Sequence, residues 1–210
     1  MAFAGGAADP FAGLVFVTSN PGKAREAAHL LGRPVKTRPA DLREIQSLSF
    51  EEVVRAKAAA AAALLGVPVL VEDSGLEVRA WDGFPGPLTK WITMGPLGQP
   101  GLARLLDAFE DRRATAVSAL AVARPGEGEA DAIVAIGRRE GSIAPAPRGT
   151  HGFGWDVLFI PDGETRTYAE MPSDEKNSDS HRARAFTALR VRLSSSTPST
   201  PRRTEGTRPS

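Results

Sequence analysis

Residues 14–32 read LVFVTSNPGKAREAAHLLG and join an apolar run, a small polar turn and a helical pattern. The apolar run, Leu14–Thr18, predicts a short buried strand. The segment Gly22–Leu31 predicts a helix that Gly32 and Pro34 bring to an end. A buried strand that turns directly into a helix is the repeating unit of α/β proteins, so this segment predicts an α/β fold.

The turn SNPGK, residues 19–23, has the chemistry of a phosphate site. Small residues let backbone N–H groups approach phosphate oxygens, the following helix directs its positive end there, and Lys23 adds a full charge. It is not a Walker A loop, because Val17 stands where that motif has its first glycine and Ala24 replaces the Ser or Thr after the lysine. A plain strand-to-helix turn with an exposed lysine fits the same residues, so both interpretations stay open.

The composition predicts one domain of ordinary globular character. The chain has 210 residues, with 26 basic and 25 acidic side chains, and this balance gives no support for a broad nucleic-acid surface. Cysteine is absent, which excludes disulfides, thiol nucleophiles and cysteine zinc sites and fits a reducing cytosol. The longest uncharged apolar run, Ala58–Val71, falls short of the roughly 20 residues that span a bilayer. The first ten residues lack the basic region of a secretory signal, so we expect a cytoplasmic protein without membrane contact.

The two ends of the chain predict loose tails around a domain at residues 13–193. Residues 1–12 are small and glycine-rich, and we expect a flexible N-terminal tail. Residues 194–210 are rich in Ser, Thr, Pro and Arg, and we expect them to be disordered. Within the domain, helices are expected at 49–65, 102–109 and 174–193, with Ser173 as an N-cap, and strands at 67–73, 76–80, 115–123, 130–138 and 157–160.

Two adjacent acids, Glu72 and Asp73, close an apolar run where ligand sites form in α/β sheets. Alternation along a strand sends them to opposite faces, so only one can readily face a shared ligand. A carboxylate beside phosphates needs a cation between them, and Mg²⁺ prefers such oxygen ligands. Glu44 is a second candidate ligand, and a solvated acidic turn is the alternative for the pair.

Three cationic side chains stand at positions where apolar residues are expected. Lys57 falls on the apolar stripe of the helix at 49–65, and Lys90 lies among apolar neighbours. Each either meets an anion in a pocket or extends outward to water. Arg182 lies one turn before Phe186 on the buried stripe of the last helix, so an acceptor must await it, in an internal salt bridge or in a ligand.

The glycine-rich loop HGFGWD, residues 151–156, holds two aromatic side chains. Phe153 or Trp155 could stack on a base, and a hydrophobic plug at the end of the sheet is the alternative. The three histidines include no pair at zinc spacing.

Six segments in chain order give the sequence a specific resemblance. They are FVTSNPGK, VLVEDSGL, GFPGPLTKW, APRGTHGFGWD, YAEMPSDEKN and SHRARA. Together they resemble the inosine triphosphate pyrophosphatase family from Leu14 to about Leu193. Two departures are mild, because Ser19 replaces a glycine of some relatives and the loop differs just before Phe153. The resemblance implies an elongated two-lobed α/β fold around a long mixed β-sheet flanked by helices, a homodimer, and hydrolysis of non-standard purine nucleoside triphosphates.

The resemblance also implies a role for each matching residue. It assigns catalysis to Asp73, Lys23 and Lys57, and the metal, Mg²⁺ or alternatively Mn²⁺, to Glu44 and Asp73. It assigns substrate binding to Thr18, Ser19, Asn20, Pro21, Gly22, Lys23, Lys57, Ser74, Lys90, Phe153, Gly154, Trp155, Asp156, Lys176, His181 and Arg182. Within this set Phe153 would stack on the purine, and Lys176, His181 and Arg182 would read the edge of the base.

The implied reaction is attack of water at the α-phosphorus, which gives a nucleoside monophosphate and pyrophosphate. Arg182 and Lys176 carry only donors, so they suit the 6-keto oxygen of hypoxanthine or xanthine and oppose the amino group of adenine. Rejection of guanine stays unexplained, because guanine shares the 6-keto group. The alternatives are a pyrophosphatase for other modified nucleotides and a nucleotide-binding module without catalysis.

Overall fold

The computed structural model of the chain describes residues 9–195, and most of both predicted tails lies outside this range. Phe11, which the prediction assigned to the N-terminal tail, is buried against Phe186, with the ring centroids 5.8 Å apart. A buried aromatic side chain belongs to the core, so the folded domain begins earlier than predicted. Among the described residues, no helix combines the length and the apolar composition that a bilayer crossing requires.

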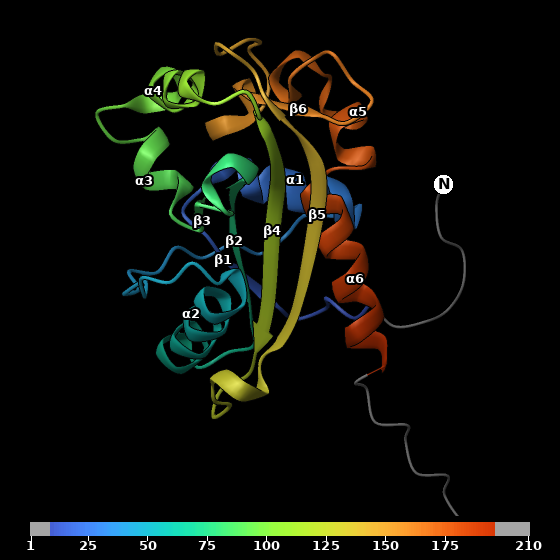
Figure 1. The fold of residues 1–210 in the computed structure, drawn as a ribbon. Coiled ribbons are helices and arrows are strands. Elements are labelled where there is room, and N and C mark those ends of the chain that lie inside the picture. The colour runs from blue at the N-terminus through green and yellow to red at the C-terminus, as the bar shows by residue number, and fades with distance from the viewer. Residues whose placement is uncertain (1–8, 196–210) are drawn as a thin grey trace, which may run out of the picture.

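A mixed sheet of six strands forms the centre of the molecule (Figure 1). The strands are β1 Val15–Val17, β2 Val69–Val78, β3 Pro85–Gly86, β4 Arg113–Ala123, β5 Ile133–Ile143 and β6 Phe159–Pro161. Their order is β1-β2-β4-β5-β6, and β3 pairs with β2 beside this path. Only β1 and β2 are parallel, and the other pairs are antiparallel. The predicted α/β class and long mixed sheet are thus confirmed.

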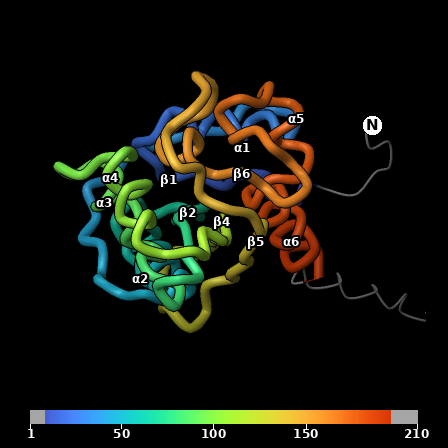
Figure 2. The backbone as a smooth tube through the Cα atoms, turned by 45° about the horizontal axis from the view of Figure 1, so that its top comes forward, coloured from blue at the N-terminus to red at the C-terminus, as the bar shows by residue number. Residues whose placement is uncertain are grey.

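Helices cover both faces of this sheet. They are α1 Pro21–Leu31, α2 Phe50–Leu65, α3 Thr89–Thr93, α4 Gly98–Leu105, α5 Ser173–Ser178 and α6 His181–Ser195. Figures 1 and 2 show α2 and α6 on opposite sides of the long strands. The Ser49 hydroxyl caps α2 by accepting from the Glu52 N–H, and Gly66 ends the helix at a φ of 64°. The start and end predicted for α2 therefore agree with the structure to within one residue.

The alternation of side chains along β2 decides which residue faces which helix. Val69 and Val71 pack in the apolar cluster under α2, whereas Leu70 packs in the cluster under α6. Because the period of a strand is two residues, Glu72 continues on the α6 face and Asp73 on the α2 face. The predicted separation of these two carboxylates is confirmed.

The prediction of two strands at 67–73 and 76–80 was wrong, because β2 is continuous. Ser74 and Gly75 remain in the ladder opposite Ser118 and Val117 of β4. A Cβ at Gly75 would lie 2.1 Å from the carbonyl oxygen of Gly86. The glycine therefore marks the close approach of β3 and not the end of a strand.

The single helix predicted at 174–193 was also wrong. It is divided into α5 and α6, because Asp179 leaves helical geometry at a φ of −150° and Ser180 starts a new helix by accepting from the Ala183 N–H. Ser173 is the first residue of α5 and not its N-cap, which is Pro172.

Smaller boundary errors arise where short helical turns adjoin the longer elements. The strand predicted from residue 130 begins at Ile133, because Glu129–Asp131 forms a 3-10 turn. The helix predicted at 102–109 is α4 followed by the 3-10 turn Leu106–Ala108, and the strand predicted at 157–160 is β6. Helix α3, with five residues, was not predicted.

Candidate active site

A cavity of about 530 Å³ opens where β1 ends and where β2 carries Glu72, Asp73 and Ser74. This volume falls within the range of small-molecule sites. The predicted residues that line it are Thr18, Ser19, Asn20, Pro21, Lys23, Glu44, Lys57, Asp73, Ser74, Lys90, Phe153, Gly154, Trp155, Asp156, His181 and Arg182. The fold thus brings together residues from positions 18 to 182 of the chain.

Two predicted residues, Gly22 and Lys176, do not line the cavity and lie against Phe153. A Cβ on Gly22 would come within 2.3 Å of the Phe153 ring, and the Lys176 ammonium lies 5.2 Å from its centroid. The lining also contains residues that the sequence did not predict: Val17, Ala40, Leu42, Glu72, Pro87, Trp91, Thr93 and Met94.

One end of the cavity gathers cations and carboxylates. Lys57 Nζ lies 2.7 Å from Glu44 Oε1. Burial raises the pKa of Glu44, but the hydrogen bond from Lys57 and its charge outweigh this and leave the pKa low. Burial lowers the pKa of Lys23, against the opposing charges of Glu72 and Asp73. The pKa of Asp73 is raised by burial, which Lys23 and Lys57 offset only in part.

The SNPGK turn uses its backbone donors to cap α1. Asn20 Oδ1 accepts from the N–H groups of Gly22 and Lys23 at 2.8 and 3.3 Å, which caps α1. The Asn20 N–H in turn donates to Thr18 Oγ1 at 3.0 Å. The turn therefore offers the cavity the side chains of Ser19, Asn20 and Lys23, while the first N–H groups of α1 are already bonded.

Asp73 and Glu44 have the features of ligands for a hard cation. Asp73 Oδ2 is buried and has no hydrogen-bond partner among residues 9–195, which is costly unless a cation or donor arrives. Glu44 is close enough for its charge to act on Asp73. Within residues 9–195 no group of three or more potential metal ligands exists. Mg²⁺ commonly binds one or two carboxylates together with substrate phosphates, so two carboxylates fit it.

Glu72 is committed to a different task from Asp73. Its Oε1 accepts from Ser118 Oγ at 2.9 Å and from Arg182 Nε at 2.8 Å, and the side chain is buried. Glu72 Oε2, like Asp73 Oδ2, is buried without a hydrogen-bond partner among residues 9–195, so the two acids differ in the bonds that Glu72 Oε1 makes with Ser118 and Arg182.

A buried ionic cluster adjoins the cavity, which Asp156 and Arg182 of the cluster also line. Arg182 forms ion pairs with Glu26 and Glu72, and Lys176 Nζ lies 2.8 Å from Glu26 Oε1 and 2.6 Å from Asp156 Oδ2. Burial raises the pKa of Glu26, but Arg182 and Lys176 outweigh this and lower it. The predicted acceptor for Arg182 is confirmed as an internal salt bridge, which uses two of its five N–H groups.

The imidazole of His181 lies between two aromatic rings beside this cluster. Its ring centroid is 5.0 Å from that of Trp155 and 5.9 Å from that of Tyr168. Burial lowers the pKa of His181 well below its usual value, and the charges of Arg182 and Lys176 lower it further. Both ring nitrogens are buried without a hydrogen-bond partner in the described chain. The ring is therefore neutral at pH 7 and offers one donor and one acceptor.

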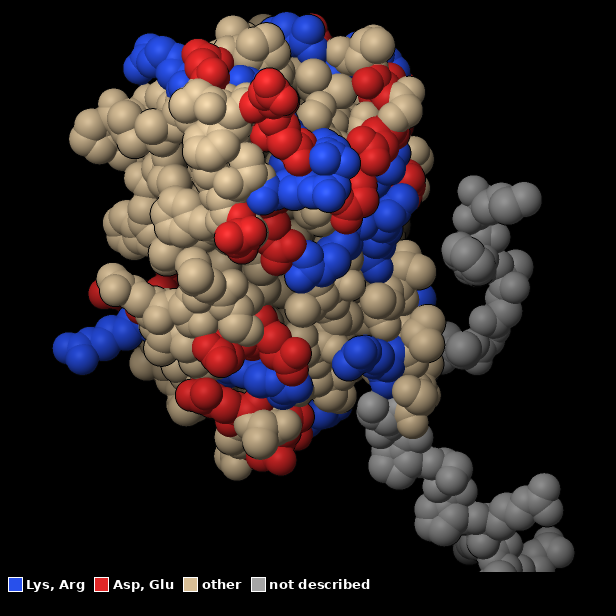
Figure 3. All heavy atoms as spheres, in the orientation of Figure 1, with Lys and Arg blue, Asp and Glu red and all other residues tan. Residues whose placement is uncertain are grey.

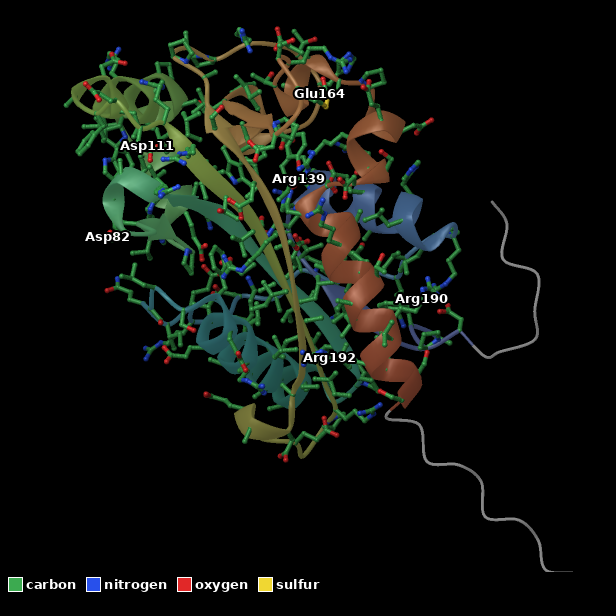
Figure 4. The ribbon with its side chains drawn as sticks, turned by 45° about the vertical axis from the view of Figure 1, so that its right-hand side comes forward. Asp82, Asp111, Arg139, Glu164, Arg190 and Arg192 are labelled. Carbon is green, nitrogen blue, oxygen red and sulfur yellow. The ribbon has the colours of Figure 1, made fainter. Side chains whose placement is uncertain are left out.

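Glu26 is the main functional residue that sequence reasoning missed. It joins Lys176 to Arg182 and is buried on the inward face of α1 with Gly22 and Ala27. Its spacing of four residues from Gly22 was a usable signal, because it places a charge on the buried stripe of a predicted helix. The same helix α6 that buries Arg182 carries Arg190 and Arg192 at exposed positions (Figure 4).

Comparisons with known proteins agree over nearly the whole chain. A family model described as the Ham1 family matches residues 14–192. An inosine triphosphate pyrophosphatase of Yarrowia lipolytica is 44% identical over 183 residues, which cover 86% of this chain and 95% of that protein. A dITP/XTP pyrophosphatase of Methanopyrus kandleri is 40% identical over 176 residues, covering 82% and 92%. A solved HAM1 protein from Coxiella burnetii has a TM-score of 0.74 at 31% identity, covering 87% and 98%.

Replacing Glu26 by Gln tests the ionic cluster. We expect Glu26→Gln to lower the free energy of unfolding by about 2 kcal/mol, because two buried charge-assisted hydrogen bonds weaken. Urea unfolding measures the change. Glu51→Gln is the control, since it breaks the exposed pair with Arg55 and should cost at most about 0.5 kcal/mol. Equal midpoints for wild type and Glu26→Gln would contradict the assigned role of the cluster.

The buried His181 predicts a pH dependence of stability. Below its ordinary pKa of about 6.5 the unfolded chain takes up a proton that folded His181 cannot, so stability falls by about 1.4 kcal/mol per pH unit. Between pH 7 and 5.5, where the unfolded imidazole titrates in part, the loss sums to about 1 kcal/mol, which urea unfolding should show in wild type and not in His181→Gln. His151→Gln, at an exposed position, should keep it. Asp73 and Asp156 also titrate, but they contribute equally to the pH dependence of all three proteins. If the plots of stability against pH were parallel for wild type and His181→Gln, the assignment of a neutral, buried His181 would be refuted.

Proposed function

The chain belongs to the Ham1 family, and we propose that it is a hydrolase that converts ITP, dITP and XTP to the nucleoside monophosphate and pyrophosphate. Its role in nucleotide metabolism is then to remove non-standard purines from the nucleotide pool. The observation that carries the proposal is the buried Asp73 Oδ2, which has no hydrogen-bond partner within residues 9–195, in a cavity that Lys23 and Lys57 also line.

The phosphate chain would lie at the end of the cavity that contains Lys23 and Lys57. Their charges oppose the negative charge that develops on the phosphate oxygens and on the departing pyrophosphate. Asp73 orients the attacking water and accepts its proton. Glu44 and Asp73 would hold Mg²⁺ or Mn²⁺, which when bound supplies further stabilisation of the phosphate charge. The ion pair with Lys57 uses Oε1 of Glu44, so Oε2 would remain available to the metal.

The purine would lie at the opposite end, against Phe153 and Trp155. Arg182 lines this end and retains unused N–H groups for a 6-keto oxygen. An adenine amino group there would face donor against donor, at a cost of about 1–3 kcal/mol. Lys176 lies outside the cavity lining, and its bond to Asp156 holds that residue in place.

A panel of triphosphates tests the proposed function. With Mg²⁺ present, pyrophosphate release from ITP and XTP should exceed that from ATP by roughly 10- to 100-fold, because of the donor mismatch with adenine. Adding GTP and dUTP to the panel separates this activity from that of a pyrophosphatase for other nucleotides. A preference for dUTP, or equal rates for ITP and ATP, would overturn the proposal.

The variant Asp73→Asn is the control for catalysis in the same panel. It keeps the size of the side chain and removes its charge, so turnover of ITP should fall by roughly 100-fold or more. Its thermal unfolding should stay within a few degrees of wild type.

We further propose that the protein is a cytoplasmic homodimer. The absence of cysteine is consistent with the reducing compartment. The dimer is supported by an apolar patch, defined as Trp91, Met94 and Leu97, whose exposed fractions are 67%, 75% and 48%. Figure 3 shows few charged side chains around α3 and α4, next to this patch.

Replacing Met94 by Lys tests the dimer. Light scattering after gel filtration should give twice the chain mass for wild type and the single mass for Met94→Lys, because a buried lysine opposes the contact. Leu64→Lys, at a similarly exposed position on α2, should remain a dimer. A monomeric wild type would refute this part of the proposal.

A further inference from the structure

Gly22 has no conformational reason to be glycine. It is the second residue of α1, and its φ lies outside the left-handed region that favours glycine. Glycine within a helix destabilises it by roughly 0.5–1 kcal/mol relative to alanine. Another constraint must therefore require the absence of a side chain at this position.

The phosphate chemistry expected of the turn does not supply that constraint. The Gly22 N–H donates to Asn20 Oδ1 at 2.8 Å, and Gly22 does not line the cavity. Its hydrogen bond is an internal cap of α1. Close approach of a phosphate to Gly22 is thus not what the structure provides.

The constraint is the ring of Phe153. A Cβ on Gly22 would lie 2.3, 2.6 and 2.7 Å from Cδ1, Cε1 and Cγ of that ring. Ordinary contact between carbon atoms is about 3.5–4.0 Å, so the whole ring would have to move. The ring therefore packs directly on the backbone of the SNPGK turn.

Phe153 is also held from its other sides. Its N–H donates to Asp156 Oδ2 at 2.8 Å, and that same oxygen accepts from Lys176. The Arg182 guanidinium carbon lies 5.4 Å from the ring centroid. Gly22 thus contacts one side of Phe153, and the other contacts of this residue come from the buried ionic cluster.

We propose that Gly22 is a positioning residue for the purine, acting through Phe153. The missing side chain lets the ring take the position from which it stacks on the base. The contact makes base stacking depend on the same turn that carries Lys23. The inference rests on the proposed function and adds a specificity role for Gly22 that is separate from phosphate binding.

The two reaction products, IMP and pyrophosphate, distinguish a role of Gly22 in base binding from a role in phosphate binding. Calorimetric titration with IMP reports the base end, and titration with pyrophosphate and Mg²⁺ reports the phosphate end. Gly22→Ala should weaken IMP binding by roughly tenfold, the scale of a lost base stack, and leave pyrophosphate within about twofold. Gly128→Ala is the control, because its Cβ would meet only Asp131 at 3.6 Å, and it should change neither affinity.

A double variant tests that Gly22 acts through Phe153. Once Phe153→Ala has removed the ring, adding Gly22→Ala should cause no further loss of IMP affinity, because the two effects are coupled. Equal weakening of IMP and pyrophosphate by Gly22→Ala, unchanged IMP binding, or additive losses in the double variant would each overturn the inference.

Two further readouts keep the test decisive. If Gly22→Ala does not fold, the Gly22→Ala/Phe153→Ala protein must fold, since the clash is gone, and its failure to do so would overturn the inference. Wild-type turnover of ITP tests the proposed function by itself. Only the ratio of variant to wild-type binding tests Gly22, so the two failures are distinguishable.

Discussion

The buried guanidinium of Arg182 must be neutralised, and the arrangement of the site follows from this requirement. An unpaired charge in the interior costs several kcal/mol, so carboxylates have to reach it. They come from separate elements, Glu26 from α1 and Glu72 from β2, while Lys176 ties Glu26 to Asp156 in the loop before β6. The cluster therefore fixes α6, α1 and that loop relative to the sheet.

The period of a β-strand then divides two adjacent acids between structure and chemistry. Glu72 points to the α6 face, where its Oε1 accepts hydrogen bonds from Arg182 and Ser118. Asp73 points to the α2 face, where Lys57 and Glu44 lie, and its Oδ2 has no partner in the described chain. A shift of one residue in the pairing of β2 would exchange the two roles, so the register of the sheet is a functional constraint as well as a structural one.

Periodic patterns in the sequence predicted those features of the fold that depend on neighbouring residues in the chain. The apolar run before the turn and the separation of Glu72 from Asp73 each follow from a single period and were correct. Glu26 was missed because its partners lie 150 and 156 residues away, so the local spacing can indicate that it is buried but not which cations pair with it. Gly75 was misread because a glycine within a strand pattern is compatible with a strand end, and the close approach of Gly86 that requires it is visible only once β3 is paired with β2.

The two ends of the cavity differ in how their charges are balanced, and this difference suits their tasks. At the base end, Arg182 is already paired with Glu26 and Glu72, so its geometry is fixed before any ligand arrives and can discriminate between donors and acceptors. At the phosphate end, burial lowers the pKa of Lys23 and raises that of Asp73, so both charges are incompletely stabilised. A phosphate chain and a cation supply the missing counter-charges. Binding free energy is thus released where the reaction occurs, while recognition of the base rests on groups that do not need to move.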